Sequence, residues 1–201
     1  MWFKSHMIEL LTKKDLKLAK IKSYKKDDVL FHELDNCTEV GFVSKGELII
    51  KSFDSDGKEI IYNNIKQNEM FGNNLLFSND KKYKGDVIAI SNSEILYFNK
   101  TDLLEILNSN IPFLESYLIN QANNTKKLNF RVKLLSLDKA KDRFMFYLKA
   151  NENKIEYESI TSLAKELNIE RETLSRLISQ LVKNKVVVQK DKTITTRKAH
   201  R

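Results

Sequence analysis

Four polar side chains of types suited to reading DNA bases are grouped near the C-terminus: Arg171, Glu172, Ser175 and Arg176. Their spacing places them on one face of the segment if that segment is helical. Arginine can donate two hydrogen bonds to O6 and N7 of guanine, and glutamate can accept one from N4 of cytosine. Alternatively, Glu172 and Arg176 form an i,i+4 ion pair on a solvated helix, which needs no nucleic acid. The surrounding elements decide between these interpretations.

The segment around these four residues has the pattern of a helix-turn-helix. Ser159 is a favourable N-cap for a first helix. Asn168 stands where a sharp turn between two helices needs a left-handed backbone, and Ile169 follows it as an apolar plug. The second helix has an apolar face opposite the polar group, made by Leu174, Leu177, Ile178 and Leu181. This arrangement favours base reading over a solvated ion pair.

Two β-rich runs after the second helix, at residues 186–188 and 193–195, predict a two-stranded wing. The same part of the chain is basic: residues 137–201 hold 15 Lys and Arg against 9 Asp and Glu, a net charge of +6 out of +8 for the whole chain. A basic segment of this kind favours a polyanionic partner, and we expect double-stranded DNA. Besides the four residues above, the predicted DNA contacts are Ser159, Thr173, Lys183, Lys190 and Lys192.

Other elements precede this segment in the chain. A helix is expected over residues 8–20, and a β-rich region follows between Lys20 and Phe98. Short runs with turn signals between them indicate a sandwich or barrel. Gly57 supplies the positive φ of one predicted hairpin. The expected strands are residues 29–31, 40–43, 47–53, 59–62, 86–90 and 95–98.

A long helix is expected to follow the barrel. Thr101 is the expected N-cap of a short helix, and Asn110-Ile111-Pro112 then opens the long one, with proline in the first turn. Apolar and small polar residues recur in it at spacings of three and four, which is a heptad pattern. Such a stripe either packs on the chain's own core or forms a two-stranded coiled coil, and the sustained period favours the coiled coil. The predicted dimer seam begins at Ile111 and continues through Leu114, Leu118, Gln121, Thr125, Leu128, Val132 and Leu135.

The predicted fold class is α+β, with an N-terminal jelly-roll β-barrel, a long dimerisation helix and a C-terminal winged helix-turn-helix. The corresponding domains are a sensor barrel at residues 7–108, the dimerisation helix at 109–136 and the DNA-binding domain at 137–201. A further short helix is expected to begin at Asp138.

The stretch from Glu170 to Leu177, with the sequence ERETLSRL, resembles the recognition helix of the CRP/FNR family of bacterial transcription regulators. The resemblance covers nearly the whole chain, because barrel, long helix and winged helix follow in the family's order. It implies that Arg171, Glu172, Ser175 and Arg176 meet DNA, with TGA in each half-site. Glu170 departs from the Ser or Thr usual in the family, so a helix cap and a possible phosphate contact are lost.

The barrel resembles the family's cyclic-nucleotide-binding fold, and the resemblance places an effector pocket at two segments, Gly72-Asn73-Asn74 and Lys82-Tyr83-Lys84. The family's nucleotide-binding members have Gly-Glu for the ribose and Arg-Ser for the cyclic phosphate. Here Asn73 replaces the carboxylate, and Tyr83 stands near the arginine position. Either lysine can meet a phosphate as a point charge, or these residues form a surface turn. We therefore expect that cyclic AMP is not the effector.

Other chemistries are constrained by residue counts. One cysteine, Cys37, excludes an iron–sulfur cluster in a single chain and fits the reducing cytoplasm. His32 and Cys37 are the only sensible axial ligands for a haem, and we expect none. Three histidines (His6, His32 and His200) are too few for a metal-dependent enzyme site in a barrel, so no metal and no enzyme activity are expected.

The expected partners are DNA, a second copy of the chain and RNA polymerase, with no membrane and either no effector or an unknown small molecule. The alternative is a cyclic-nucleotide-binding signalling module that acts through protein contacts, which would leave Arg171 and Arg176 without a purpose.

Overall fold

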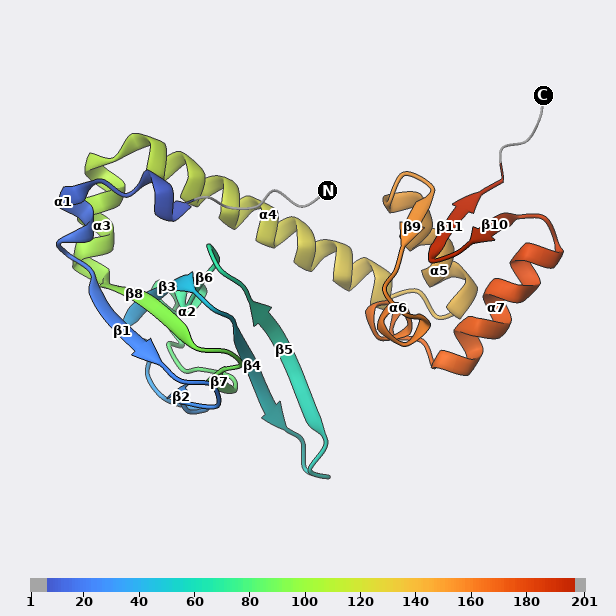
Figure 1. Ribbon diagram of the computed structural model, residues 1–201, viewed down its shortest axis with the longest axis horizontal. Helices are drawn as coiled ribbons and strands as arrows, with labels where there is room; N and C mark the ends of the chain where they lie inside the picture. Colours follow the sequence, from blue (N-terminus) through green and yellow to red (C-terminus); the bar gives the residue numbers. More distant parts are fainter. Residues whose placement is uncertain (1–6, 198–201) are drawn as a thin grey trace. The chain divides into compact units, whose positions relative to one another are not determined.

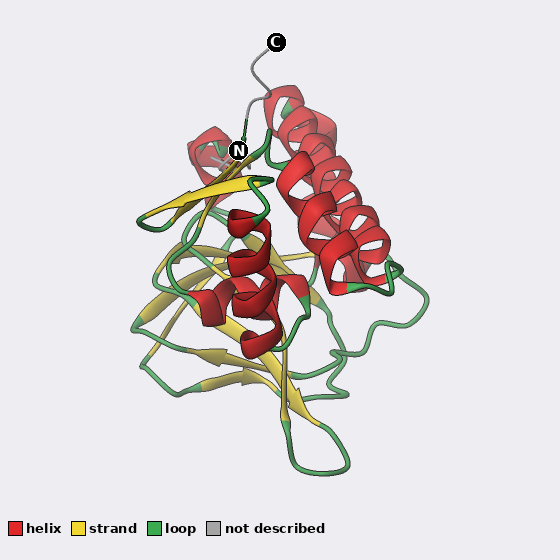
Figure 2. Cartoon of the chain, turned by 90° about the vertical axis from the view of Figure 1, so that its right-hand side faces the viewer, coloured by secondary structure: helices red, strands yellow, loops and turns green. Residues whose placement is uncertain are grey.

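A computed structural model describes residues 7–197 and divides the chain into two compact units, Met1–Gln121 and Ala122–Arg201. Each unit contains both helices and strands (Figure 2). The boundary lies inside α4 (Ile111–Leu135), which runs as one uninterrupted helix (Figure 1). The predicted α+β class is confirmed. The division of the chain at residues 109 and 136 stays a prediction.

The N-terminal segment is not the single helix expected over residues 8–20. It forms a 3-10 turn, η1 (Met7–Leu10), and a short helix, α1 (Lys13–Leu16). Thr12 interrupts the helix because its hydroxyl accepts a hydrogen bond from the Asp15 N–H at 3.2 Å, while the Asp15 carboxylate accepts one from the Thr12 N–H at 2.9 Å. This reciprocal capping box starts a new helix after Thr12.

Two four-stranded antiparallel sheets form the predicted barrel (Figure 1). One sheet has the order β1 (Lys20–Tyr24), β8 (Ser93–Asn99), β3 (Glu39–Lys45) and β6 (Met70–Phe71). The other has the order β2 (Val29–Phe31), β7 (Asp86–Ala89), β4 (Leu48–Phe53) and β5 (Glu59–Ile65). All six expected strands are present, and Gly57 has the expected positive φ of 75°. The sequence prediction missed β1 and β6, one of them lysine-rich and exposed and the other only two residues long.

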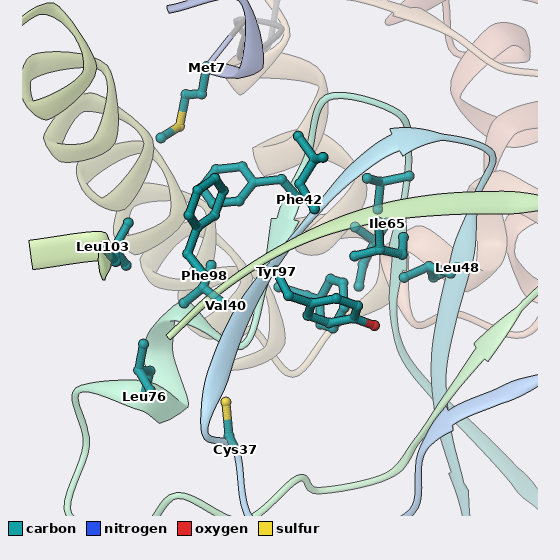
Figure 3. Packing of buried hydrophobic residues seen from close by; sticks show 14 of the residues in the cluster. Met7, Cys37, Val40, Phe42, Leu48, Ile65, Leu76, Tyr97, Phe98 and Leu103 are labelled. Carbon is teal, nitrogen blue, oxygen red and sulfur yellow. The ribbon is translucent and has the colours of Figure 1, made fainter. Parts of the chain in front are cut away.

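The core of this unit lies between the two sheets and extends under the N-terminal turn and α3 (Lys100–Ser109) (Figure 3). Phe42 and Phe98 are fully buried and meet edge to face, with ring centroids 5.7 Å apart. The sequence predicts Thr101 as the N-cap of α3, and this prediction is wrong. Asn99 has that role, because its side-chain oxygen accepts a hydrogen bond from the Asp102 N–H at 2.9 Å.

α4 begins at Ile111, within the Asn110-Ile111-Pro112 segment that the sequence predicted. The Asn110 side-chain oxygen accepts a hydrogen bond from the Phe113 N–H at 3.1 Å, while its amide group donates to the Asp15 carboxylate at 2.9 Å. Phe113 and Tyr117 are buried in the core of the first unit. The first turns of α4 are therefore anchored to the barrel unit by one polar and two aromatic side chains.

The second unit contains α5 (Ala140–Ala150), β9 (Lys154–Glu156), α6 (Ile160–Leu167), α7 (Arg171–Lys183), β10 (Val187–Lys190) and β11 (Thr193–Thr196). The helix expected from Asp138 begins two residues later, after the N-cap Lys139. The expected two-stranded wing has a third strand, because β9 pairs with β11 on the side away from β10. The unit has its own apolar core, to which all three of these helices contribute.

Candidate nucleic-acid interface

The turn between α6 and α7 has the geometry that the sequence predicted. Ser159 and Ser162 cap the start of α6 reciprocally, with N–H to hydroxyl distances of 3.0 and 3.1 Å. Asn168 ends α6 in the left-handed conformation, at φ 51° and ψ 51°. The Ile169 N–H then donates to the Ala164 carbonyl at 2.9 Å, which closes a Schellman motif. Local sequence therefore fixes the angle at which α7 leaves the turn.

Two arginines that the sequence analysis did not single out hold this turn from neighbouring helices. Arg143 of α5 donates to the Asn168 carbonyl at 2.6 Å, and Arg131 of α4 donates to the Glu166 carbonyl. Both guanidinium groups satisfy carbonyls at the C-terminal end of α6, where the helix dipole favours cations. Their contacts tie the last part of α4 and α5 to the helix-turn-helix.

The predicted base-reading group lies on one solvent-exposed face of α7. Arg171, Glu172, Ser175 and Arg176 line an open hollow together with Ile160 of α6. The opposite face is buried through Leu174, Ile178 and Leu181. The sequence analysis missed Ile160, which is the first residue of α6 and is only half-buried.

The alternative i,i+4 ion pair between Glu172 and Arg176 does not neutralise the charges on this face. Among the described residues no ion pair joins Glu172 to Arg176, and Glu172 instead lies 3.7 Å from the guanidinium of Arg171. Both partners of that contact are about two-thirds exposed, so it contributes little to stability. In the described structure Glu170 makes no side-chain cap bond, as its residue type predicted, so the first N–H groups of α7 keep their capacity to bind an anion.

The predicted phosphate contacts are all solvent-exposed. Lys183 ends α7, and Lys190 and Lys192 flank the tip of the wing, where Lys190 pairs with Thr193 across a two-residue turn. Asp191 occupies the first turn position with φ 52°. Thr173 is half-buried on α7, and the Ser159 hydroxyl is engaged in capping α6. The lysines are thus placed for a backbone contact more directly than Thr173 and Ser159.

The predicted dimer seam on α4 is exposed over most of its length in a single chain. Leu118, Leu128 and Val132 have 56%, 64% and 60% of their surface exposed. The buried side chains of the same helix lie off the seam: Phe113, Tyr117 and Leu134. Leu114 and Gln121 are half-buried, and Thr125 and Leu135 are exposed. A row of exposed leucine and valine at heptad spacing is an apolar stripe that the chain's own cores do not cover.

The residues expected around an effector differ in their exposure and in their contacts. Gly72 precedes α2 (Asn73–Leu76) in a left-handed conformation, with φ 79°. Asn73 is 8% exposed and donates a 2.7 Å hydrogen bond to the side-chain oxygen of Gln121 on α4. The Gln121 amide donates in turn to the Tyr117 hydroxyl at 3.3 Å. Asn74, the next residue of α2, is exposed.

Tyr83 lies inside an aromatic cluster. Its ring stacks on Phe31 with centroids 4.7 Å apart, and Phe31 also meets Phe71 and Tyr97 edge to face. Within the described part of the chain, the buried Tyr83 hydroxyl has no hydrogen-bond partner. Burial raises the pKa of Tyr83 well above its ordinary value of 10.0, so the group stays neutral. A neutral hydroxyl gives a bound anion no positive charge with which to pair.

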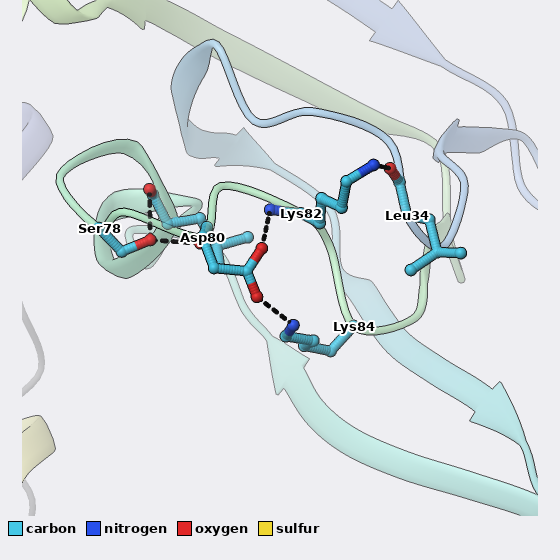
Figure 4. A network of polar contacts seen from close by, with 6 residues as sticks. Leu34, Ser78, Asp80, Lys82 and Lys84 are labelled. Carbon is cyan, nitrogen blue, oxygen red and sulfur yellow. Dashed lines mark hydrogen bonds and ion pairs between the residues drawn. The ribbon is translucent and has the colours of Figure 1, made fainter.

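Lys82 and Lys84 are exposed, and polar contacts hold both side chains on the surface (Figure 4). The Lys84 ammonium pairs with the Asp80 carboxylate at 2.5 Å, and the Lys82 ammonium donates to the Leu34 carbonyl at 3.3 Å. The turn also includes a contact from the Ser78 hydroxyl to the Asp80 carbonyl. These contacts match the surface-turn interpretation of the segment.

The residues considered as metal or haem ligands are dispersed. Cys37 is buried, and its thiol donates to the carbonyls of Glu39 and Gly72 at 3.3 and 3.4 Å. Burial raises the pKa of the Cys37 thiol, which lowers its reactivity. The His32 side chain is 71% exposed and lies beside Asp86. His6 and His200 lie outside the described residues. Between residues 7 and 197, His, Cys, Asp and Glu form no group of three or more that could hold a metal, and no helix is long and apolar enough to cross a membrane.

A family model for the cyclic nucleotide-binding domain matches residues 21–110. The whole chain is similar in fold to a variant of CooA from Carboxydothermus hydrogenoformans, with a TM-score of 0.68, 16% identity and coverage of 98% of this chain and 94% of that one. It is also similar to the Catabolite Activator Protein of Thermus thermophilus, with a TM-score of 0.57, 18% identity and coverage of 95% and 93%. The c-di-GMP-responsive global regulator CLP of Xanthomonas campestris has a TM-score of 0.56, 16% identity and coverage of 96% and 99%. Among curated proteins, none matches the chain by sequence.

The chain has the fold of the CRP/FNR regulators. The resemblance seen in the sequence is therefore confirmed for the fold, and the barrel matches the cyclic nucleotide-binding model over residues 21–110. Two of these similar proteins are an activator protein and a global regulator. A barrel of the cyclic nucleotide-binding type suggests a small-molecule effector.

Proposed function

We propose that this protein is a sequence-specific, DNA-binding transcription regulator that acts as a homodimer on an inverted-repeat operator. The observation that carries the proposal is the exposed polar face of α7, where Arg171, Glu172, Ser175 and Arg176 line one hollow at the start of the second helix of a winged helix-turn-helix. The N-terminal part of such a helix is the part that enters the major groove. Lys190 and Lys192 at the wing tip supply phosphate contacts.

The dimer is proposed from the apolar stripe on α4. Exposed Leu118, Leu128 and Val132 lose contact with water when they pack into a second α4, which contributes on the order of 25 cal/mol for each Å² of apolar surface. Two-fold symmetry then presents two copies of α7 to DNA. Half-sites about one helical turn apart, roughly 10 base pairs, follow from that symmetry. RNA polymerase is the further partner that a regulator bound near a promoter requires, and the cytoplasm is where both are found.

Cyclic AMP does not fit the effector region of this chain. A partly buried phosphate anion needs a paired cation and charge-assisted hydrogen bonds. Tyr83 stands where the resemblance places arginine, yet it is neutral and stacked on Phe31, and the amide of Asn73 is already bound to Gln121. Lys82 and Lys84 are engaged on the surface. The effector is therefore another small molecule, or the dimer binds DNA without one.

A gel-shift assay with fragments of the host genome tests the function directly. The wild-type protein is expected to retard a small set of fragments in the presence of excess non-specific DNA. A variant with Arg171→Ala and Arg176→Ala, which keeps the buried face of α7, should lose that preference. If neither protein prefers any fragment while the chain binds a cyclic nucleotide and a protein partner, the signalling module is the better assignment.

A further inference from the structure

A polar residue of the proposed dimer seam is hydrogen-bonded to the barrel. Gln121 occupies the fourth seam position, and its side-chain oxygen accepts the 2.7 Å hydrogen bond from Asn73 at the start of α2. Its amide donates to Tyr117, one turn earlier on α4, whose ring is buried in the core of the same unit. Both ends of the Gln121 amide group are therefore held by groups of the barrel unit.

This contact lies where the family's barrel would place an effector. Asn73 replaces the carboxylate that the resemblance assigns to the ribose, and it directly follows Gly72, whose left-handed backbone leads into α2. There is little room at the turn: a Cβ atom on Gly72 would lie 3.1 Å from the Cys37 sulfur and 3.3 Å from the Tyr83 oxygen. The turn is thus closely packed, and Asn73, 8% exposed, is aimed at α4.

A glutamine at a seam position restricts the register in which two helices can pair in a coiled coil. Polar groups at core positions fix register and oligomer state at a cost in stability, because they must be hydrogen-bonded in the dimer. A glutamine side chain also has several rotatable bonds, so its orientation is costly to fix unless a partner holds it. Asn73 and Tyr117 hold Gln121 within the protomer before any second α4 arrives.

We propose that Asn73 is a positioning residue for the dimer helix. Its bond to Gln121 links α2 to the seam of α4 directly, so that the side chain which sets the register is oriented by the barrel without a bound effector. The inference rests on the proposed function and deepens it, since it names the contact through which the barrel acts on the DNA-binding dimer.

The donors and acceptors of this contact allow a conservative rescue. Asn73→Ala removes the donor and leaves the Gln121 oxygen without it. In Asn73→Asp the carboxylate can accept from the Gln121 amide group after that group turns over, and the Tyr117 hydroxyl can then donate to the Gln121 oxygen. Two hydrogen bonds are kept in this arrangement, so Asn73→Asp should retain most of the function that Asn73→Ala loses.

The test measures dimer dissociation by sedimentation equilibrium and operator affinity by fluorescence anisotropy for Asn73→Ala, Gln121→Ala, the double variant and Asn73→Asp. Asn74→Ala, a change at the exposed neighbour on α2, is the matched control. We expect Asn73→Ala to weaken dimerisation about fivefold, as for loss of one net hydrogen bond, and operator binding to fall with it. Gln121→Ala, which also loses the bond to Tyr117, should weaken dimerisation at least as much. The double variant should be no weaker than Gln121→Ala, and Asn73→Asp should stay within about twofold of wild type.

The inference is overturned if Asn73→Ala behaves like Asn74→Ala, if the two single effects add in the double variant, or if Asn73→Asp is as weak as Asn73→Ala. Thermal unfolding of each variant shows whether the barrel itself has been lost. If Asn73→Ala does not fold, Gln121→Ala and Asn73→Asp decide whether the inference holds. Gln121 is only half-buried on α4, so its truncation should leave the barrel folded. Failure of the wild-type protein to bind any operator would instead reject the proposed function.

Discussion

The ring of Phe31 stacks on the ring of Tyr83 with centroids 4.7 Å apart and planes 16° apart. Phe31 comes from β2, and Tyr83 from the segment where the resemblance to the CRP/FNR family places a phosphate-binding arginine. A position that would serve an anion is thus occupied by an aromatic contact, and stacked pairs of this kind add about 0.5–1.5 kcal/mol beyond the surface they bury. The interior of the barrel is built to hold apolar groups at this point.

Cyclic AMP is therefore expected to have no effect on DNA binding. Titration calorimetry with cyclic AMP and cyclic GMP should detect no micromolar binding, and the affinity for operator should be the same with and without each nucleotide. Micromolar binding accompanied by tighter operator binding would show that the region accepts the nucleotide after all. Lys82→Ala and Lys84→Ala would then identify the phosphate contact.

Charges placed in the seam of α4 are expected to separate the dimer. Leu118→Glu combined with Leu128→Glu puts carboxylates on opposing helices next to each other, so the protein should sediment as a monomer without measurable operator affinity. Lys126→Glu combined with Lys133→Glu places carboxylates at exposed positions off the seam, by reversing two charges, and serves as the control. A dimer that survives the leucine changes would mean that the stripe on α4 is not the interface.

Arg176 and Lys190 should differ in the kind of affinity that they contribute. Arg176→Ala is expected to cost about 1–3 kcal/mol on the preferred operator and to relax the preference at one G·C pair. Lys190→Ala should weaken binding to all sequences alike and reduce the slope of log affinity against log salt by about one. Competition binding with operators changed at single positions and a salt titration measure both effects. Unaltered specificity in Arg176→Ala would remove it from the base-reading group.

The buried carboxylate of Asp15 should make the barrel unit sensitive to acid. Burial works against ionisation there, but hydrogen bonds from Thr12 and Asn110 outweigh it and hold the pKa of the Asp15 carboxyl below its ordinary value of 3.8. A group whose pKa is lowered by folding stabilises the fold above its unfolded pKa, and that contribution is lost as the pH falls through the folded value.

Asp15→Ala is therefore expected to destabilise the protein by about 1–3 kcal/mol at neutral pH, since the Asn110 amide loses a buried acceptor. Urea unfolding should show that the difference from wild type decreases as the pH falls below 3.8. Asp56→Ala, in the exposed turn between β4 and β5, should unfold like wild type both at neutral pH and at acidic pH. If the difference in the free energy of unfolding between Asp15→Ala and wild type is independent of pH, the side chain acts through packing alone.

Local signals explain why the second unit was predicted well. Ser159 and Asn168 each act through the backbone of their own turn, so the cap and the left-handed residue follow from residue type. Pro112 acts in the same way at the start of α4, which belongs to the first unit. The missed elements depend on distant partners. The sequence of β1 alternates lysine with other residues and is a strand because it pairs with β8, about 70 residues away, which no local pattern reports.

The candidate sites also include some that follow from local spacing and others that depend on residues far apart in the sequence. The polar face of α7 follows from helical spacing, whereas the bond between Asn73 and Gln121 joins residues 48 positions apart. Nothing near Asn73 in the sequence indicates that its amide is bound to α4, and nothing near Tyr83 indicates the ring of Phe31. Arg131 and Arg143 were missed for the same reason, since each contacts a backbone carbonyl of α6 or its turn from another helix.

Selection of duplexes from a randomised DNA library with the wild-type protein, without added nucleotide, is the most direct measurement of sequence-specific binding by a symmetric dimer. We predict enrichment of an inverted repeat, with half-sites that contain TGA and centres about 10 base pairs apart. Selection that enriches no sequence, or only a single asymmetric site, would contradict the assignment of this chain as a dimeric operator-binding regulator.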